Sequence, residues 1–277
     1  MKRYPPVPHV DSAPEGLFES GHLWVQELID GAQLRFRLRA SGPLEFGDNR
    51  RQFGDDPPEP YRHAVRHVRE TLDREALRAA VDDVETVTFV GVSTHRLAVP
   101  YDLARVPSVL GVDVWDDDRG EFLPPDETER VFDRLGLEAV NTFRREVRAA
   151  DFDPTPDAVP PSAWYDGPAA GVVLRTKTGD IATLPNPAVD REPSFEPLEG
   201  DAEAVVERLV PEALVRRVAD GLPAGRDPTY DAVFDRVEEE LWRAHHGRLA
   251  HQDTDVDPGA VSAAVGRRVG DWLAGRS

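Results

Sequence analysis

Residues 34–39 read Leu-Arg-Phe-Arg-Leu-Arg, and this unbroken alternation of apolar and basic side chains limits the folds open to the chain more than any other feature. Successive side chains of a β-strand point to opposite faces, so the segment predicts a half-buried strand. Its apolar residues are expected to face a core, with Arg35, Arg37 and Arg39 on the other face. Residues 23–29 form a second strand candidate, and Asp30-Gly31 between the two is a turn signal that predicts a hairpin.

Other segments extend this pattern into a mixed region. Apolar side chains recur at helical spacing over about residues 61–80, which predicts one amphipathic helix. The apolar runs 86–92 and 109–115 predict buried strands, and Thr178-Gly179-Asp180 lies between two more strand candidates, so a second hairpin is expected. Asp126 is expected to cap a short helix that ends at Gly136. The predicted fold class is α+β, dominated by antiparallel strands.

The C-terminal part of the chain has a different character. Three helical patterns occur there, at roughly residues 201–219, 229–246 and 258–274, with proline-containing linkers between them. We therefore expect a larger domain over residues 1–195 and a small helical domain over residues 196–277.

The charge balance is far from neutral, because 52 acidic and 33 basic residues give a net charge of -19 and a pI of about 4.8. Lys2 and Lys177 are the only lysines. The acidic residues are spread along the whole chain, which indicates a halophilic protein adapted to molar salt, where the Debye length is about 3 Å. The acidity then reports on the solvent more than on function. Salt screening also weakens the argument that an acidic protein avoids nucleic acid.

The absence of cysteine excludes disulfides, thiolate metal sites and thiol nucleophiles. No apolar run approaches the about 18 residues that a membrane span needs, and the N-terminus lacks the apolar centre of a signal peptide. The expected location is therefore the cytoplasm, without a membrane partner. The proline-rich N-terminus in which Lys2 lies is expected to be mobile.

Two groups of histidines have spacings that can chelate a metal. His63 and His67 lie four residues apart on a predicted helix, and His245-His246 precede His251. No third ligand is evident for His63 and His67, and alternating His and Arg is more typical of a solvated helix face, so no metal site is expected from either group.

Residues 24–36 resemble the strand–motif–strand unit of the ATP-dependent RNA ligases, whose motif is Lys-x-Asp-Gly. In that family the lysine attacks the α-phosphate of ATP and forms a lysyl-AMP intermediate. Leu28 stands at the lysine position of this chain and is followed by Asp30-Gly31. The resemblance implies a nucleotidyltransferase fold, that is, an antiparallel-sheet (ATP-grasp-like) ligase domain. A helical C-terminal domain also occurs in one branch of RNA ligases.

Four further segments follow in the order found in the family and cover the chain to about residue 190. Phe89-Val90-Gly91-Val92 resembles a Phe-x-Gly-Glu strand, with Val92 at the glutamate position. Residues 101–115 resemble a Tyr-Asp to Phe-Asp-Val stretch and retain Asp113. Residues 167–175 resemble the Glu-Gly-Val-Val-x-Arg motif, with Ala170 replacing the glutamate and Arg175 retained. Residues 181–184 resemble the strand of the last motif, with Thr183 at its lysine position.

The resemblance implies that this chain has lost the ligation chemistry. Leucine has no lone pair with which to form a phosphoramidate, and the replacements Val92, Ala170 and Thr183 bring no charge to the site. No catalytic residue is therefore assigned. The positions that remain as nucleotide-binding or RNA-binding candidates are Asp30, Gly31, Arg50, Arg51, Asp113, Arg175 and Lys177.

The favoured function is a catalytically inactive RNA-ligase-like protein that binds a nucleotide, RNA or a partner protein. One alternative is an active ATP-dependent RNA ligase or nucleotidyltransferase with an unorthodox site, in which Lys177 replaces the nucleophile. The other is a structural assembly module. ATP and Mg²⁺ are implied as cofactors only if family activity is retained. An apolar cleft floor would favour the assembly module, and a lining of arginine and aspartate would favour binding.

Overall fold

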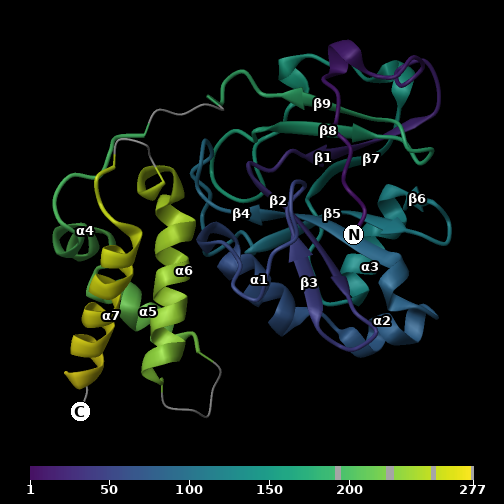
Figure 1. Ribbon diagram of the computed structural model, residues 1–277. Coiled ribbons are helices and arrows are strands. Elements are labelled where there is room, and N and C mark those ends of the chain that lie inside the picture. The colour runs from purple at the N-terminus through teal and green to yellow at the C-terminus, as the bar shows by residue number, and fades with distance from the viewer. Residues whose placement is uncertain (191–194, 223–227, 251–253, 276–277) are drawn as a thin grey trace. The chain divides into compact units, whose positions relative to one another are not determined.

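The computed structural model describes residues 1–190, 195–222, 228–250 and 254–275, and the chain divides into two compact units, Met1–Glu192 and Pro193–Ser277. The first unit contains all nine strands of the described chain, and the second contains four helices (Figure 1). The fold class is α+β with antiparallel sheets, as the sequence predicts.

The larger sheet of the first unit has five strands in the order β3-β2-β4-β5-β6. All of its pairs are antiparallel. The strand bounds are β2 Gly31–Leu38, β3 Leu44–Gly47, β4 Val87–Thr94, β5 Val109–Asp116 and β6 Glu121–Phe122. The register places Phe36 of β2 opposite Phe89 of β4, and their rings stack with centroids 5.0 Å apart.

The smaller sheet has four strands in the order β7-β1-β8-β9, again all antiparallel. The strand bounds are β1 His22–Glu27, β7 Thr142–Arg148, β8 Gly171–Arg175 and β9 Ile181–Pro185. The hairpin predicted around Thr178-Gly179-Asp180 is confirmed as β8 and β9. Gly179 has φ of +100°, which a residue without Cβ adopts readily in such a turn.

The hairpin predicted from residues 23–29 and 34–39 is wrong. β1 pairs with β7 and β8, whereas β2 pairs with β3 and β4, so the two strands belong to different sheets. Asp30 does not make a tight turn between them. Its carboxylate accepts the main-chain N–H of Ala98 at 2.7 Å and of Val99 at 3.0 Å, and its own N–H donates to the Tyr101 hydroxyl. Residues 28–30 therefore connect the two sheets.

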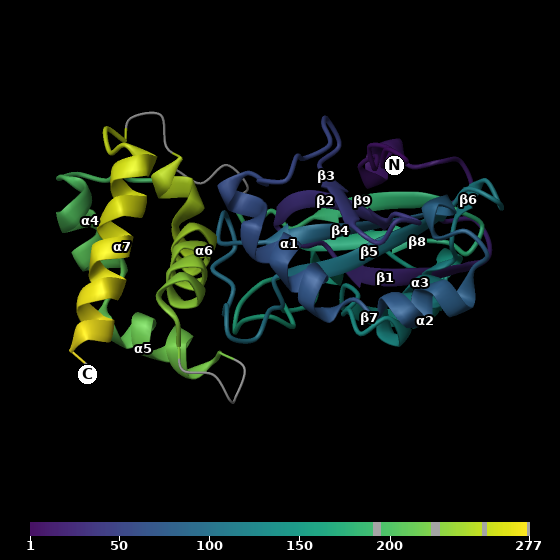
Figure 2. The ribbon, with the colours of Figure 1, turned by 60° about the horizontal axis from the view of Figure 1, so that its bottom comes forward.

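Helices cover one face of the larger sheet (Figure 2). The alternation over residues 34–39 is confirmed, because Leu34, Phe36 and Leu38 are fully buried against these helices. The helix bounds are α1 Glu59–Thr71, α2 Arg74–Ala80 and α3 Pro125–Arg134. The single helix predicted over 61–80 is instead α1 and α2, because the Asp73 carboxylate accepts the N–H groups of Glu75 and Ala76 and begins a new helix. Asp126 lies in the first turn of α3, whose N-cap is Pro124.

The second unit is a helical cluster with its own apolar core. Its helices are α4 Ala202–Leu209, α5 Glu212–Asp220, α6 Tyr230–Leu249 and α7 Pro258–Ala274. The predicted helix over 201–219 is two helices, because Pro211 has no N–H to continue the first one. Among the described residues, no helix is both long and apolar enough to span a bilayer.

Candidate functional site

The inner faces of the two sheets enclose a cavity of about 220 Å³. This volume is below the roughly 300–1,000 Å³ that is usual for small-molecule sites. Most of its lining is apolar, with valine contributed by strands of both sheets. The lining residues are Tyr4, Val7, Gln26, Glu27, Leu28, Ile29, Gly31, Gln33, Val90, Gly91, Val92, Val112, Val140, Val173, Arg175 and Thr183.

Three of the four positions at which the resemblance places lost catalytic groups meet in this cavity: Leu28, Val92 and Thr183. They come from the connection after β1, from β4 and from β9, so strands far apart in sequence bring them together. Ala170 is not among the lining residues. It is buried in the adjoining apolar cluster that contains Ile29 and is joined to Val92 at its edge.

A buried ion pair fixes two of the retained candidates, Arg175 and Asp113. Arg175 Nη2 lies 2.8 Å from Asp113 Oδ2, and Arg175 Nη1 donates to the carbonyl of Val112 at 2.9 Å. The Tyr4 hydroxyl donates to the same Asp113 oxygen at 3.2 Å. Burial raises the pKa of Asp113, and Arg175 opposes this rise. Arg175 is therefore already neutralised within the wall of the cavity.

Glu27 is a polar lining residue that the sequence analysis does not identify. It is 1% exposed and accepts hydrogen bonds from Ser162 Oγ at 2.6 Å, from Ala163 N at 3.2 Å and from Asn141 Nδ2 at 3.2 Å. Burial raises the pKa of Glu27, while these three donors oppose the rise. Its only sequence signal is a carboxylate at the end of a strand with an apolar centre, directly before Leu28.

Asp30, Gly31 and Lys177 are not brought together. Gly31 lines the cavity, and a Cβ there would lie 2.5 Å from the Ser93 carbonyl, so only glycine fits. The Asp30 carboxylate already accepts hydrogen bonds from the main-chain N–H groups of residues 98 and 99. Lys177 lies at the turn between β8 and β9, away from the cavity lining, with its Nζ 2.8 Å from Glu146 and 3.4 Å from Asp126. The hydrogen bond to Glu146 raises the pKa of Lys177, which is the reverse of what a nucleophilic amine needs.

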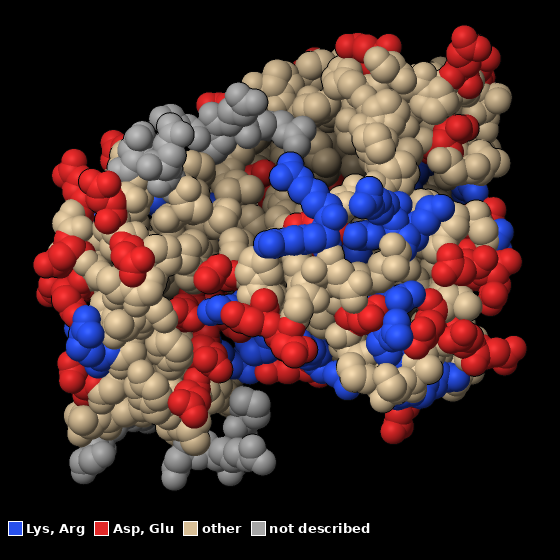
Figure 3. Space-filling view, viewed as in Figure 1, with Lys and Arg blue, Asp and Glu red and all other residues tan. Residues whose placement is uncertain are grey.

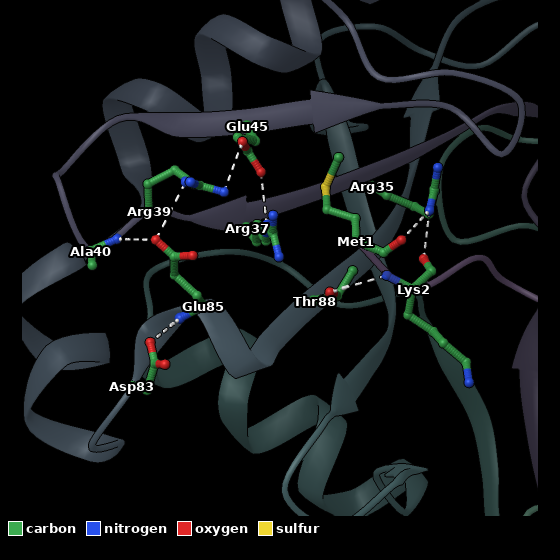
Figure 4. A network of polar contacts seen from close by, with 10 residues as sticks. All are labelled: Met1, Lys2, Arg35, Arg37, Arg39, Ala40, Glu45, Asp83, Glu85 and Thr88. Carbon is green, nitrogen blue, oxygen red and sulfur yellow. Dashed lines mark hydrogen bonds and ion pairs between the residues drawn. The ribbon is translucent and has the colours of Figure 1, made fainter.

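The three arginines of β2 do not form an open basic face (Figure 4). Arg37 Nε lies 2.7 Å from Glu45, and Arg39 pairs with Glu45 at 3.2 Å and with Glu85 at 3.3 Å. Arg35 is 4% exposed, and it donates to main-chain carbonyls rather than to carboxylates. Arg35, Arg37 and Arg39 lie on the face opposite the core, as the alternation predicts, but carboxylates neutralise Arg37 and Arg39 there.

Four other cations lie together nearby, and we call them the basic patch: Lys2, Arg3, Arg50 and Arg51. All four residues are exposed. Asn49 joins the two chain segments that carry them, since its Oδ1 accepts the N–H of Tyr4 at 3.0 Å and its Nδ2 donates to the Tyr4 carbonyl at 2.7 Å. Within the described parts of the chain, no carboxylate forms an ion pair with any of the four. Figure 3 shows basic side chains gathered in the centre of this face of the first unit, with acidic ones around them.

Residues 1–8, which we call the N-terminal segment, run across the mouth of the cavity from one sheet to the other. At the larger sheet, the N–H of Lys2 lies 3.5 Å from Thr88 Oγ1, and Lys2 Nζ lies 3.6 Å from the centre of the Trp115 ring. At the smaller sheet, the Pro8 carbonyl accepts the N–H of Thr183 at 2.8 Å. The terminus is expected to be mobile, but the N-terminal segment is instead bound to both sheets, and it can be followed in purple in Figure 1.

The described histidines do not assemble a recognisable metal site. His63 is buried, with its Nε2 3.1 Å from Ser93 Oγ, and burial lowers the pKa of His246. His251 lies outside the described residues. Over the ranges that the structure describes, no group of three or more His, Asp or Glu side chains is arranged to hold a metal ion.

Comparison with known proteins identifies the fold. No family model and no curated protein matches the sequence. Among solved structures, the chain is similar to Naegleria gruberi RNA ligase variants with ATP and Mn (12% identity, TM-score 0.54) and with AMP and Mn (13%, TM-score 0.52). It is also similar to the same ligase with PPi (13%, TM-score 0.52). In each case 68% of this chain is covered, and the chain spans 56–57% of the ligase. The first unit therefore has an RNA-ligase-like nucleotidyltransferase fold.

Proposed function

We propose that this chain is a non-ligating protein of the RNA-ligase fold that binds RNA through the basic patch. The observation that carries the binding role is a cluster of four exposed cations that have no carboxylate partner among the described residues, on a chain of net charge -19. With 52 acidic residues available, unpaired arginines are unexpected unless an anion occupies them. The guanidinium fork pairs with two phosphate oxygens at once, so such contacts can persist in salt that screens diffuse attraction.

The lining of the cavity supports the proposed loss of catalysis. Adenylyl transfer needs an amine at the α-phosphate and cations to compensate the charge that develops there. Leu28 offers no lone pair, Thr183 brings no charge, and Arg175 is already paired with Asp113. Among the described lining residues Glu27 alone is a carboxylate, and its oxygens already accept three hydrogen bonds. These residues do not fit ATP with Mg²⁺, so neither is assigned a role in this cavity.

The RNA-binding proposal is tested by titrating a short single-stranded RNA at graded KCl. Replacing Arg50 and Arg51 with serine should weaken binding and make the slope of log K against log[KCl] less steep by about 1.4, from about 0.7 per phosphate contact. A matched control replaces Arg119 and Arg130, which are exposed but paired with carboxylates. The control should bind as the parent does. If the parent binds no RNA at the lowest KCl that keeps it folded, the apolar cavity makes the assembly module the better reading.

The inactivity proposal has its own test. Incubated with α-labelled ATP and Mg²⁺ or Mn²⁺ in high salt, the protein should acquire no acid-stable label, because a phosphoramidate needs an amine in the cavity. Label that is lost on Lys177→Ala would establish the active-ligase alternative. Label that persists in this variant would identify another nucleophile and equally contradict the proposal.

A further inference from the structure

Arg35 is a buried cation whose hydrogen bonds all go to main-chain carbonyls. Its Nε and Nη2 donate to the carbonyl of Asp48, the first at 3.1 Å, and its Nη1 donates to the carbonyls of Met1 at 3.1 Å and Lys2 at 2.6 Å. In the part of the chain that the structure describes, no carboxylate forms an ion pair with it. A buried charge is costly unless it is paired, so this site favours an anion.

The hydrogen bonds of Arg35 divide into two sets. Those to Asp48 hold the guanidinium within its own sheet, since Asp48 directly follows β3. Those from Nη1 go only to the N-terminal segment. If the segment left, Nη1 would lose the carbonyls of Met1 and Lys2, while the hydrogen bonds to Asp48 would keep the rest of the guanidinium anchored.

The charges beside Arg35 support the same reading. The N-terminal segment brings the Met1 amino group and Arg3 close to Arg35. Burial lowers the pKa of the Met1 amino group, and Arg37 and Arg35 lower it further. Burial also lowers the pKa of Arg35; Asp48 raises it and Arg3 lowers it. These cations disfavour one another's charge, and a bound polyanion would offset the repulsion between them.

The N-terminal segment is attached at separate points rather than by a continuous ladder. Tyr4 donates to Asp113 and exchanges two hydrogen bonds with Asn49, and Pro8 accepts from the N–H and the hydroxyl of Thr183. Only one isolated bridge, between His9 and Thr183, joins this part of the chain to β9. An attachment of this kind can open locally while the sheets stay intact.

We propose that the N-terminal segment is a displaceable plug, and that the face of the larger sheet beneath it binds a phosphate-bearing ligand through Arg35 Nη1. The carbonyls of Met1 and Lys2 occupy the places of two phosphate oxygens in the closed form. Displacing the plug also removes Tyr4 and Val7 from the wall of the cavity and enlarges it. The plug is inferred from the contacts of Arg35, and RNA binding from the exposed cations of the basic patch. The two share Lys2 and Arg3, which lie in the N-terminal segment, so displacing the segment leaves only Arg50 and Arg51 of the patch in place.

The test uses inorganic tripolyphosphate, which has neither base nor ribose, and calorimetry at the lowest KCl that keeps the chain folded. In the full chain, Tyr4→Ala with Asn49→Ala removes three attachments of the plug without changing the net charge. This loosened variant should bind tripolyphosphate at least tenfold more tightly than the parent. Adding Arg35→Gln should abolish the gain. Adding Arg37→Gln should preserve it, because Arg37 lies on the same strand but is paired with Glu45.

A reversible disulfide tests, within a single variant, whether the closed position of the plug controls binding. The chain has no cysteine, so Lys2→Cys with Thr88→Cys in the loosened variant permits a single disulfide at the point where these residues meet. The oxidised form should bind as weakly as the parent, and reduction should restore the tenfold gain. Equal affinity of the oxidised and reduced forms, or a gain that survives Arg35→Gln, would overturn the proposal.

Discussion

Replacing Arg175 with leucine tests whether the retained arginine is a structural element or a free ligand-binding group. The side chains of Arg175 and Asp113 are 7% and 3% exposed, with 2.8 Å between Nη2 and Oδ2. Removing one member of a buried pair leaves an uncompensated charge and typically costs about 3–5 kcal/mol, whereas an exposed pair contributes about 0.2–1 kcal/mol. Because both side chains are buried, the larger cost, that of a buried pair, applies here.

The expected effect is large enough to measure by thermal unfolding in molar KCl. For a unit of 192 residues, 1 kcal/mol shifts the Tm by roughly 2–4 °C, so Arg175→Leu should lower it by about 6–20 °C. The matched control is Arg119→Leu, whose partner Glu127 lies at 2.9 Å but whose pair is exposed at 51% and 36%. The control should shift the Tm of this unit by less than about 4 °C.

A second substitution separates the charge from the packing. Asp113→Asn removes the stranded charge while still accepting the Tyr4 hydrogen bond, so Arg175→Leu with Asp113→Asn should be more stable than Arg175→Leu alone. We expect a coupling energy of about 1–3 kcal/mol between the two positions. A Tm drop below about 4 °C for Arg175→Leu, or no recovery in the double variant, would refute the assignment of Arg175 as a buried structural partner.

Three further outcomes are expected. The Tm should rise steeply between dilute buffer, where the Debye length is about 30 Å at 0.01 M, and molar KCl, and a flat Tm would contradict the halophilic interpretation. The pKa of Glu27 is raised in the fold, so the stability that Glu27 contributes is fully present below the unfolded pKa and is lost as the pH rises through the folded pKa. The Tm of Glu27→Gln relative to the parent should therefore improve as the pH rises above about 4.5. An unchanged Tm difference between pH 4 and 8 would argue against a raised pKa. Gly111→Ala should destabilise the first unit by about 1–3 kcal/mol, measured by denaturant titration, because its Cβ would lie 2.5 Å from the Phe132 ring; a neutral result would mean that the ring moves aside at no cost.

Local patterns in the sequence predict much of the fold because they report on nearest neighbours. The alternation over β2 identifies its buried face, and the α7 bounds agree with the helical pattern over 258–274. The breaks at Asp73 and Pro211 also have local signals, an N-cap residue and a missing N–H, but the apolar periodicity runs through both and conceals them. The hairpin fails because Asp-Gly is a turn signal only when the flanking strands pair with each other, and here each strand finds partners elsewhere.

The candidate site is less predictable than the fold for the same physical reason. Leu28, Val92 and Thr183 meet because the order of motifs reflects the topology, which the resemblance supplies. Pairing of Arg37 with Glu45 and the burial of Arg35 depend on cross-strand neighbours and on the N-terminal segment, which no periodicity reveals. Three prolines among the first eight residues indicate an irregular segment but not where it binds.

The attachment of the N-terminal segment also has a kinetic consequence. The hydrogen bond between Pro8 and the Thr183 hydroxyl spans 175 positions of the chain, and Tyr4 reaches Asp113 across 109. Contacts between such distant residues form late because the intervening chain must first be ordered. During synthesis residues 1–8 leave the ribosome long before β9 exists. The nascent first unit therefore passes through a stage in which its two sheets have begun to assemble and the N-terminal segment does not yet bridge them. Because of the order of translation, each newly made molecule has a cavity that the N-terminal segment does not yet cover before it has a covered one.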